Sequence, residues 1–195
     1  MLPLLLASAS PRRRELLERV GVPLEVRPVD VDETPRPGES PRAYVARVAR
    51  DKAAAARRVP GQWVLAADTT VTAGGAILGK AASEAEAADM LRALSNRVHE
   101  VITAYAIVGE TTVEGMVVTE VEMIAMDEPL IAGYVASGEW RGKAGAYAIQ
   151  GIGAALVRGV RGSVTNVIGL PLVEVLDALR AAGAPHARLD HGMPA

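Results

Sequence analysis

The sequence predicts an α/β protein built on a mixed β-sheet, and two patterns lead to that prediction. Strand-like and helix-like segments alternate over the first half of the chain. Two long segments of strand-forming residues, 98–108 and 111–125, then follow one another directly and indicate paired strands. Because this pair interrupts the alternation, the sheet is expected to be mixed.

Composition limits the classes of protein to which this chain can belong. Half of its 195 residues are hydrophobic, which is enough for one substantial core or two closely associated lobes. The net charge of -2 gives no molecule-wide field for nucleic acid, and 3% aromatic residues leave few rings to stack single-stranded bases. There is no Cys for disulfides or thiolate metal sites. No apolar run is long enough for a membrane span or a signal peptide, so a soluble, cytoplasmic protein is expected.

The first strand and helix come from a segment that contains three consecutive arginines. Residues 4–7 form an apolar strand, Ser10 is the expected N-cap, and Pro11 suits the first helical position. The arginines at positions 12–14 therefore fall in the first turn, where unpaired N–H groups carry a partial positive charge. Each cation is disfavoured there by up to about 1 kcal/mol, so a nearby negative group is expected.

A second strand, an acidic loop and a long helix are predicted next. Residues 24–28 form the strand, and the segment 29–40 is too rich in Pro and Gly for regular structure. This loop carries Asp30, Asp32 and Glu33. Ser40 and Pro41 repeat the cap and proline signal for a helix over 43–58. The charged residues of this helix are expected to be mostly solvated: Arg47, Arg50, Asp51 and Lys52.

The middle of the chain predicts a strand, a hairpin and a helix. The buried-strand pattern ends at Asp68, which places this carboxylate at a strand terminus. Gly74 and Gly75 mark the turn of the hairpin that follows. Ser83 and Glu86 then form a capping box for a helix that runs to about residue 94.

Two helices flank a glycine-rich loop in the last third of the chain. Asp127 opens a helix that Gly138 ends, and the loop 139–151 leads into strand-like residues. The segment from Leu170 forms a last amphipathic helix, and the tail after it has no periodicity. With no repeat and no linker, we expect a single domain over residues 1–182 and a disordered tail over 183–195.

Cationic and acidic residues recur in the predicted loops, and together they indicate phosphate chemistry. Arg is suited to bidentate phosphate contacts, whereas Lys52 and Lys80 would act as point charges. Asp68 and Glu33 are the best candidates to hold a divalent metal or to activate water. Each has a simpler interpretation as well, because an Asp before Thr often caps a turn and a lysine on an alanine-rich helix often lies at the surface.

Other catalytic classes lack their motifs. The sequence has no Walker motif, because the glycine before Lys80 lacks the upstream spacing, and no G-x-S-x-G elbow surrounds Ser8. The three histidines are scattered, which disfavours a histidine metal site, and His99 is expected to hydrogen-bond within the fold. Trp63 and Trp140 are expected to pack in the core or at an interface.

Seven segments occur in order along residues 4–179: SASPRR, DETP, AADT, LGK, SNRVHEVIT, KAGAYAIQG and NVIGLP. Together they closely resemble the motifs of the Maf family of nucleoside triphosphate pyrophosphatases. The resemblance implies hydrolysis of a nucleoside triphosphate to monophosphate and pyrophosphate, with a divalent cation such as Mg²⁺, Mn²⁺ or Co²⁺. It also implies an elongated mixed sheet flanked by helices, with two lobes, a central cleft and commonly a homodimer.

The resemblance implies roles for particular residues. Asp68 matches the proton acceptor, and the positions that govern base specificity match Arg12, Thr69 and Gln150. The polar residues that line the phosphate and metal region match Ser8, Arg13, Glu33, Lys52 and Lys80. Asp68 would orient or deprotonate the water that attacks the α-phosphorus, and whether it also ligates the metal with Glu33 stays open. Ala81 departs from the Pro that usually follows Gly-Lys, which loosens the loop but leaves the charge of Lys80.

The function also has alternatives. Arg12, Thr69 and Gln150 match the branch of the family that prefers dTTP and UTP, since a carboxamide offers a donor and an acceptor to thymine or uracil. The other branch prefers 7-methyl-GTP and carries Trp, Gln and Glu at these places. A non-enzymatic regulator of septum formation, which would bind a protein or DNA, is the rival from another class. The balanced charge does not indicate the basic patch that such a regulator would use.

Overall fold

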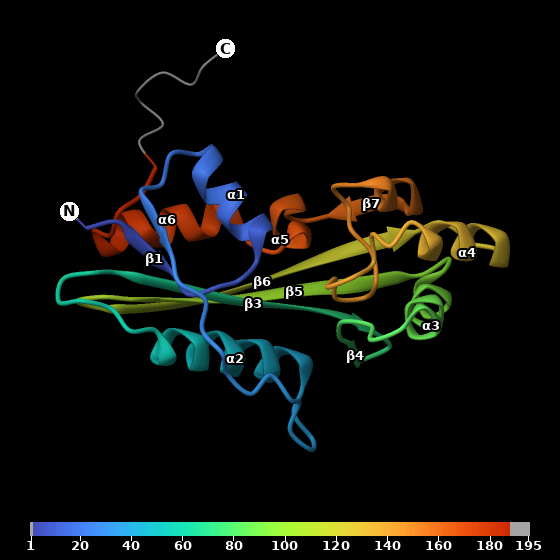
Figure 1. Cartoon of the computed structure of the whole chain (residues 1–195), viewed down its shortest axis with the longest axis horizontal. Coiled ribbons are helices and arrows are strands. Elements are labelled where there is room, and N and C mark those ends of the chain that lie inside the picture. The colour runs from blue at the N-terminus through green and yellow to red at the C-terminus, as the bar shows by residue number, and fades with distance from the viewer. Residues whose placement is uncertain (1, 188–195) are drawn as a thin grey trace, which may run out of the picture. The chain divides into compact units, whose positions relative to one another are not determined.

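The computed structural model describes residues 2–187, whose strands form one mixed sheet. The order of the strands is β2-β1-β3-β5-β6-β7, with β4 paired to β3 (Figure 1). The strands are β1 (Leu4–Leu6), β2 (Leu24–Val26), β3 (Val64–Ala73), β4 (Ala76–Leu78), β5 (Val98–Val108), β6 (Thr112–Met123) and β7 (Val157–Arg161). β1 is parallel to β2 and β3, whereas the pairs β3–β4 and β6–β7 are antiparallel. The predicted mixed α/β sheet is therefore confirmed.

Capping residues set the starts of three helices, as the sequence predicts. The helices are α1 (Pro11–Arg19), α2 (Pro41–Ala55), α3 (Glu84–Leu94), α4 (Glu128–Ala136), α5 (Val164–Ile168), α6 (Leu172–Ala182) and the 3₁₀ helix η1 (Ile152–Leu156). Ser40, Ser83 and Asp127 accept hydrogen bonds from first-turn N–H groups of α2, α3 and α4. Ser10 precedes α1, but its side chain makes no capping bond. None of these helices combines the length and the apolar character needed to cross a membrane.

The described chain divides into two compact units, which confirms the expected two lobes. The first unit comprises residues 2–68, 103–116 and 169–187, and the second comprises residues 69–102 and 117–168. The boundary falls within β3, β5 and β6, so each unit contains part of these three strands.

In the first unit, α2 packs on one face of the sheet, and α1 and α6 lie on the other face (Figure 1). Ala53 of α2 shares a core cluster with five residues in or beside β1, β3 and β5: Leu5, Ala7, Val64, Ala66 and Ala106. Because successive residues of a strand point to opposite faces, Asp68 shares a face with Val64 and Ala66. This register directs Asp68 toward the helix that carries Lys52.

In the second unit, α3 and α4 pack together around another core. Its large buried residues include Leu91, Leu94, Val121, Met123, Ile131 and Trp140. Trp140 is 4% exposed and Trp63 of the first unit is 6% exposed, which confirms their expected packing role. The predicted hairpin turn is also confirmed, because Gly74 and Gly75 have φ values of 57° and 83°, which glycine adopts without strain.

β3 is longer than the sequence indicated, and this corrects the placement of Asp68. The strand runs from Val64 to Ala73, so the prediction that it ends at Asp68 is wrong. The next four residues are three Thr and one Val, whose branched side chains favour a strand. Asp68 therefore belongs to the middle of a strand, where its position is better fixed than at a terminus.

Two boundaries at the ends of helices also differ from prediction, and one short helix was not predicted. α2 ends at Ala55, before the predicted residue 58, and α5 was not predicted. The first residues of the predicted tail belong to the described structure, since Gly183 ends α6 and both Ala184 and Ala187 are buried. The rest of that tail, residues 188–195, lies outside the described residues.

Candidate active site

A buried lysine between two carboxylates is the central feature of the first unit. The Nζ atom of Lys52 lies 2.8 Å from Oδ1 of Asp68 and 2.6 Å from Oε1 of Glu33. Lys52 and Asp68 are each 7% exposed, and charged side chains are rarely so buried unless they are paired. The expectation that Lys52 is solvated is wrong, because the register of β3 places Asp68 against α2.

Arg13 is buried in the same unit and interacts electrostatically with these carboxylates. Its Nε atom donates to the carbonyl of Gly169 at 2.8 Å, and Nη1 donates to Oγ of Ser8 at 3.1 Å. Burial lowers the pKa of Arg13, and the charges of Asp68 and Glu33 oppose that shift. We call Arg13, Glu33, Lys52 and Asp68 the charged cluster. It balances two cations against two carboxylates, and with Ser8 it unites five of the predicted residues.

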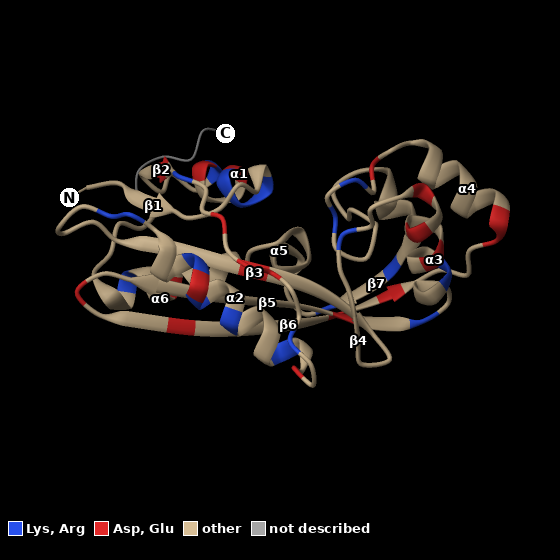
Figure 2. Ribbon diagram, turned by 60° about the horizontal axis from the view of Figure 1, so that its bottom comes forward, with Lys and Arg blue, Asp and Glu red and all other residues tan. Residues whose placement is uncertain are grey.

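The neighbouring arginines of α1 have other surroundings. Arg14 is exposed and lies 3.7 Å from Glu18, one turn later. Arg12 is partly buried; burial lowers its pKa, and the charge of Glu15 opposes that shift. Figure 2 shows acidic and basic residues together on α1. The helix itself thus supplies part of the negative charge expected near its first turn.

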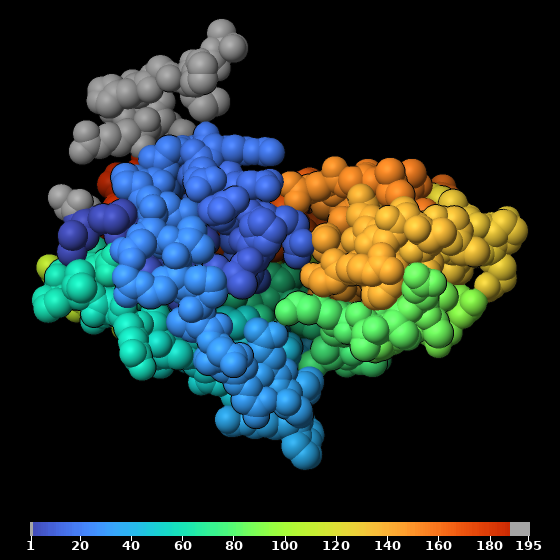
Figure 3. Space-filling model, viewed as in Figure 1, coloured from blue at the N-terminus to red at the C-terminus, as the bar shows by residue number. Residues whose placement is uncertain are grey.

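The acidic loop before α2 is closed by its own hydrogen bonds. Oδ1 of Asp32 accepts from the N–H of Thr34 at 2.9 Å, and Oε2 of Glu39 accepts from the N–H of Arg36 at 3.0 Å. These are turns in which a side chain replaces a backbone acceptor. The loop lies at the surface beside α2 (Figure 3), and of its three predicted carboxylates Glu33 is the one that contacts the buried lysine.

The remaining three predicted residues belong to the second unit. Thr69 is half-buried in β3, and strand geometry points its side chain to the opposite face from that of Asp68. Lys80 and Gln150 are exposed, so a ligand can reach the ammonium of one and the carboxamide of the other. Their roles in recognition stay predictions.

The segment that carries Lys80 is fastened through its backbone. Lys80 pairs with Ala144 in an antiparallel bridge, and the N–H of Gly145 contacts the carbonyls of the two residues before Lys80 at 3.2 and 3.1 Å. Gly145 has a φ of +68°, and a Cβ there would lie 2.9 Å from Val71, so glycine is required. These contacts hold the loop that Ala81 was expected to loosen.

Sequence reasoning missed Glu139, which fixes the loop around Gln150. Its Oε1 accepts from the N–H of Ile152 at 2.9 Å, and its Oε2 accepts from the N–H of Gly153 and the hydroxyl of Tyr134, each at 2.8 Å. A Cβ on the glycine after Gln150 would lie 1.6 Å from Oε1. The two glycines that flank Ile152 were the available signal of this close approach.

His99 forms a buried neutral pair with Tyr147 in the second unit. Its Nε2 lies 2.9 Å from the tyrosine hydroxyl, and the two rings meet edge to face. Burial lowers the pKa of His99 to about 4, so the imidazole is neutral at pH 7. The expectation that His99 hydrogen-bonds within the fold is confirmed.

The donor set of the first unit fits a divalent cation that arrives with phosphate ligands. No group of three or more acidic, histidine or cysteine side chains within residues 2–187 could hold a metal by itself. Mg²⁺ is commonly held by one or two carboxylates together with substrate phosphates. The carboxylates of Glu33 and Asp68 lie close together, because both contact Nζ of Lys52. The role of these two residues as metal ligands stays a prediction.

This chain is similar to one described protein family and to several known proteins. The profile of the family described as Maf-like protein matches residues 3–182. A dTTP/UTP pyrophosphatase of Anaeromyxobacter dehalogenans is 54% identical over 187 residues, covering 93% of this chain and 95% of the relative. One of Cereibacter sphaeroides is 52% identical over 184 residues, covering 93% and 96%. A solved dITP/XTP pyrophosphatase of Mycobacterium abscessus superposes with a TM-score of 0.46 at 16% identity, covering 93% of this chain and 98% of that one.

Proposed function

The chain belongs to the Maf family, and on that basis we propose that it hydrolyses dTTP and UTP to the nucleoside monophosphate and pyrophosphate. Relatives that are identical to this chain at more than half of the aligned residues carry the name dTTP/UTP pyrophosphatase. The observation in this chain that supports the proposal most is the burial of Lys52 between Glu33 and Asp68. Burying charges in this way costs free energy. Binding of a polyphosphate and its metal would explain why this chain buries them.

The charged cluster supplies the groups that attack on the α-phosphorus requires. Asp68 orients or deprotonates the attacking water, a role in which a positioned base typically contributes about 10²- to 10⁴-fold in rate. Arg13 and Lys52 stabilise the negative charge that develops on the departing pyrophosphate, and Lys80 adds a further cation. A bound divalent cation would neutralise phosphate charge, and Glu33 and Asp68 are the residues that would hold it.

Base selection is assigned to Arg12, Thr69 and Gln150. The carboxamide of Gln150 offers a donor to O4 and an acceptor to N3–H of thymine or uracil. A glutamate at that position would offer acceptors alone, which suit a purine with N–H donors and extra positive charge. Exposure of Gln150 leaves it available for such a contact.

The proposal includes the wider setting of the enzyme. Its substrates belong to the nucleotide pool of the cytoplasm, so we place it there. Mg²⁺, Mn²⁺ and Co²⁺ are the cations to compare, and we propose a homodimer as the assembly. We propose a single catalytic domain that covers residues 1–182.

A substrate panel tests the proposed function. Pyrophosphate release is measured from dTTP, UTP and 7-methyl-GTP with each of the three cations. We expect dTTP and UTP to be turned over faster than 7-methyl-GTP, and Gln150→Glu to shift the ratio toward the methylated purine. Equal or faster turnover of 7-methyl-GTP by the wild type would contradict the specificity, and no release from any nucleotide would favour the non-enzymatic regulator.

A further inference from the structure

We propose that Arg47 is a positioning residue, which fixes the acidic loop so that Glu33 is aligned on Lys52 before substrate and metal bind. The sequence predicts Arg47 on a solvated helix face, and the structure shows that this prediction is wrong. Its side chain is only 12% exposed. The inference rests on the proposed function, because it concerns the same charged cluster.

Arg47 binds the end of the acidic loop through a bidentate contact with Glu39. Its Nε donates to Oε1 of Glu39 at 2.7 Å, and its Nη2 donates to Oε2 of Glu39 at 2.8 Å. The Glu39 side chain is 10% exposed, and paired contacts of this kind are the strongest that arginine makes with a carboxylate. The guanidinium also lies 5.7 Å from the ring centre of Tyr44, which limits its movement.

Besides a 3.5 Å contact with Asp51 on its own helix, Arg47 contacts the residues on both sides of Glu33. Nη2 donates to the carbonyl of Thr34 at 3.0 Å, and Nη1 donates to the carbonyl of Asp32 at 3.3 Å. The backbone before and after Glu33 is therefore tied to α2. Lys52, whose ammonium contacts the carboxylate of Glu33, belongs to the same helix. One helix thus fixes both the backbone that carries this carboxylate and the ammonium that it contacts.

The loop needs such a fastening because it has no regular secondary structure. Residues 27–36 form neither a helix nor a strand, so they lack the repeating backbone hydrogen bonds that hold those elements. Ordering such a segment costs conformational entropy. Because the contacts of Arg47 already order the loop in the free protein, this entropy is not lost when the ligand binds. A displacement of about 1 Å in a reacting group can cost about 100-fold in rate.

The substitution Arg47→Lys tests the proposal, because lysine keeps the charge but cannot form the fork and both carbonyl contacts together. We expect the concentration of Mn²⁺ that gives half-maximal activity to rise by about 10-fold or more, and kcat/KM for dTTP to fall by about 10- to 100-fold. Arg50→Lys is the matched control on the same helix. Arg50 is exposed and pairs with Glu114 at 3.4 Å. The kinetic constants of the Arg50→Lys enzyme should therefore stay at the wild-type level.

A double-mutant cycle with Glu33→Ala separates positioning from general stability. If Arg47 acts through Glu33, Arg47→Lys weakens binding of Mn²⁺ and α,β-methylene-dTTP in the wild-type background but adds no loss in the Glu33→Ala background. Equal losses in both backgrounds would overturn the proposal. Titration measures this binding without turnover.

Hydrogen exchange of the free protein gives a readout that does not depend on the reaction. Arg47→Lys should speed exchange of the amides of residues 32–39 and leave those of α3 unchanged. If these amides exchange in Arg47→Lys at the wild-type rate, the positioning role of Arg47 is overturned, even if the enzyme is a dTTP pyrophosphatase. Conversely, the variant could show faster exchange while the wild type releases no pyrophosphate. That result would support the positioning role of Arg47 and contradict the proposed function alone.

Discussion

The two units of the molecule bury polar groups of different kinds. The first unit buries the charged cluster, in which the ammonium of Lys52 contacts two carboxylates. The second unit buries neutral groups. His99 pairs with Tyr147, and the amide of Asn166 donates to the carbonyl of Val101 at 3.0 Å and to a threonine hydroxyl at 2.9 Å.

This difference separates groups that can react from groups that hold the structure. A neutral pair such as His99 and Tyr147 hydrogen-bonds within the fold, although Nδ1 of His99 is buried without a partner. A charged ligand gains little by displacing one member of such a pair. Paired charges can exchange partners when a ligand brings phosphate and metal charge, and they are costly to leave unpaired. The hydrolytic step is therefore expected to depend on the charged cluster, and changes to the buried neutral groups of the second unit should act on stability.

Asp68→Asn should have the largest effect on activity, because it removes the carboxylate and keeps the side-chain volume. We expect kcat for dTTP to fall by about 10³-fold, within the range that loss of a general base produces. The matched control is Asp177→Asn, since Asp177 is exposed and pairs with Arg180 at 2.9 Å on α6. Turnover of Asp68→Asn close to that of the control would remove Asp68 from the mechanism.

Lys52→Met should have the largest effect on stability. It leaves two carboxylates without the cation that they share, and removal of one partner from a buried pair costs about 3–5 kcal/mol. Urea denaturation at pH 7 measures the free energy of unfolding. A loss below about 1 kcal/mol would mean that the cluster is solvated in solution and not buried as described.

His99 should make stability depend on pH between its folded and unfolded pKa values. The folded value is about 4 and the unfolded value is about 6.5, so the unfolded chain binds the proton first as the pH falls. Stability should drop through this window, by up to about 3 kcal/mol at pH 4. His99→Gln lacks this contribution, so the difference between variant and wild type should change across the window. A constant difference from pH 7 to pH 4 would contradict the buried, neutral imidazole.

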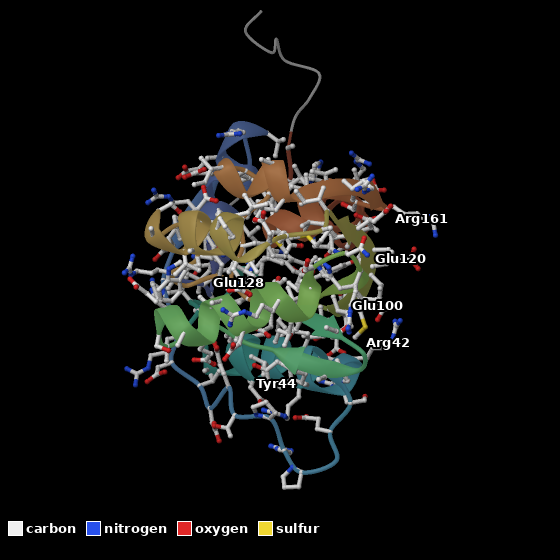
Figure 4. All side chains as sticks on the ribbon, turned by 90° about the vertical axis from the view of Figure 1, so that its right-hand side faces the viewer. Arg42, Tyr44, Glu100, Glu120, Glu128 and Arg161 are labelled. Carbon is white, nitrogen blue, oxygen red and sulfur yellow. The ribbon has the colours of Figure 1, made fainter. Side chains whose placement is uncertain are left out.

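The smallest effect is expected at an exposed ion pair of β6 and β7. Nη1 of Arg161 lies 2.8 Å from Oε2 of Glu120, and the two labelled side chains lie at the surface in Figure 4. Exposed pairs contribute little because water and salt screen them, so Glu120→Gln should change the free energy of unfolding by less than about 1 kcal/mol. A loss as large as that of Lys52→Met would remove the contrast between buried and exposed charges.

Local signals in the sequence predicted the elements better than they predicted burial. Cap residues such as Ser83 and Asp127 act on their own first turns, so the helix starts could be read from a few neighbouring residues. The burial of Lys52 depends on which face of β3 lies against α2, and that register is set by contacts far apart in the chain. The end of β3 was misplaced because an Asp before Thr resembles a turn, although branched side chains continue the strand.

The candidate site was predicted by residue type and family resemblance, and its supporting contacts were not. Arg13, Glu33, Lys52 and Asp68 were named in advance, and the structure brings them together. Arg47 was not among them, because an arginine on a helix gives no local sign that it will bind backbone carbonyls of a loop. Such contacts are visible once the loop has been placed.

Hydrolysis of dTTP in ¹⁸O-labelled water tests the central claim most directly. If the charged cluster directs water to the α-phosphorus, mass spectrometry will find one ¹⁸O atom in dTMP, none in pyrophosphate, and equal amounts of the two products. Label in pyrophosphate, or release of dTDP and inorganic phosphate, would contradict this account.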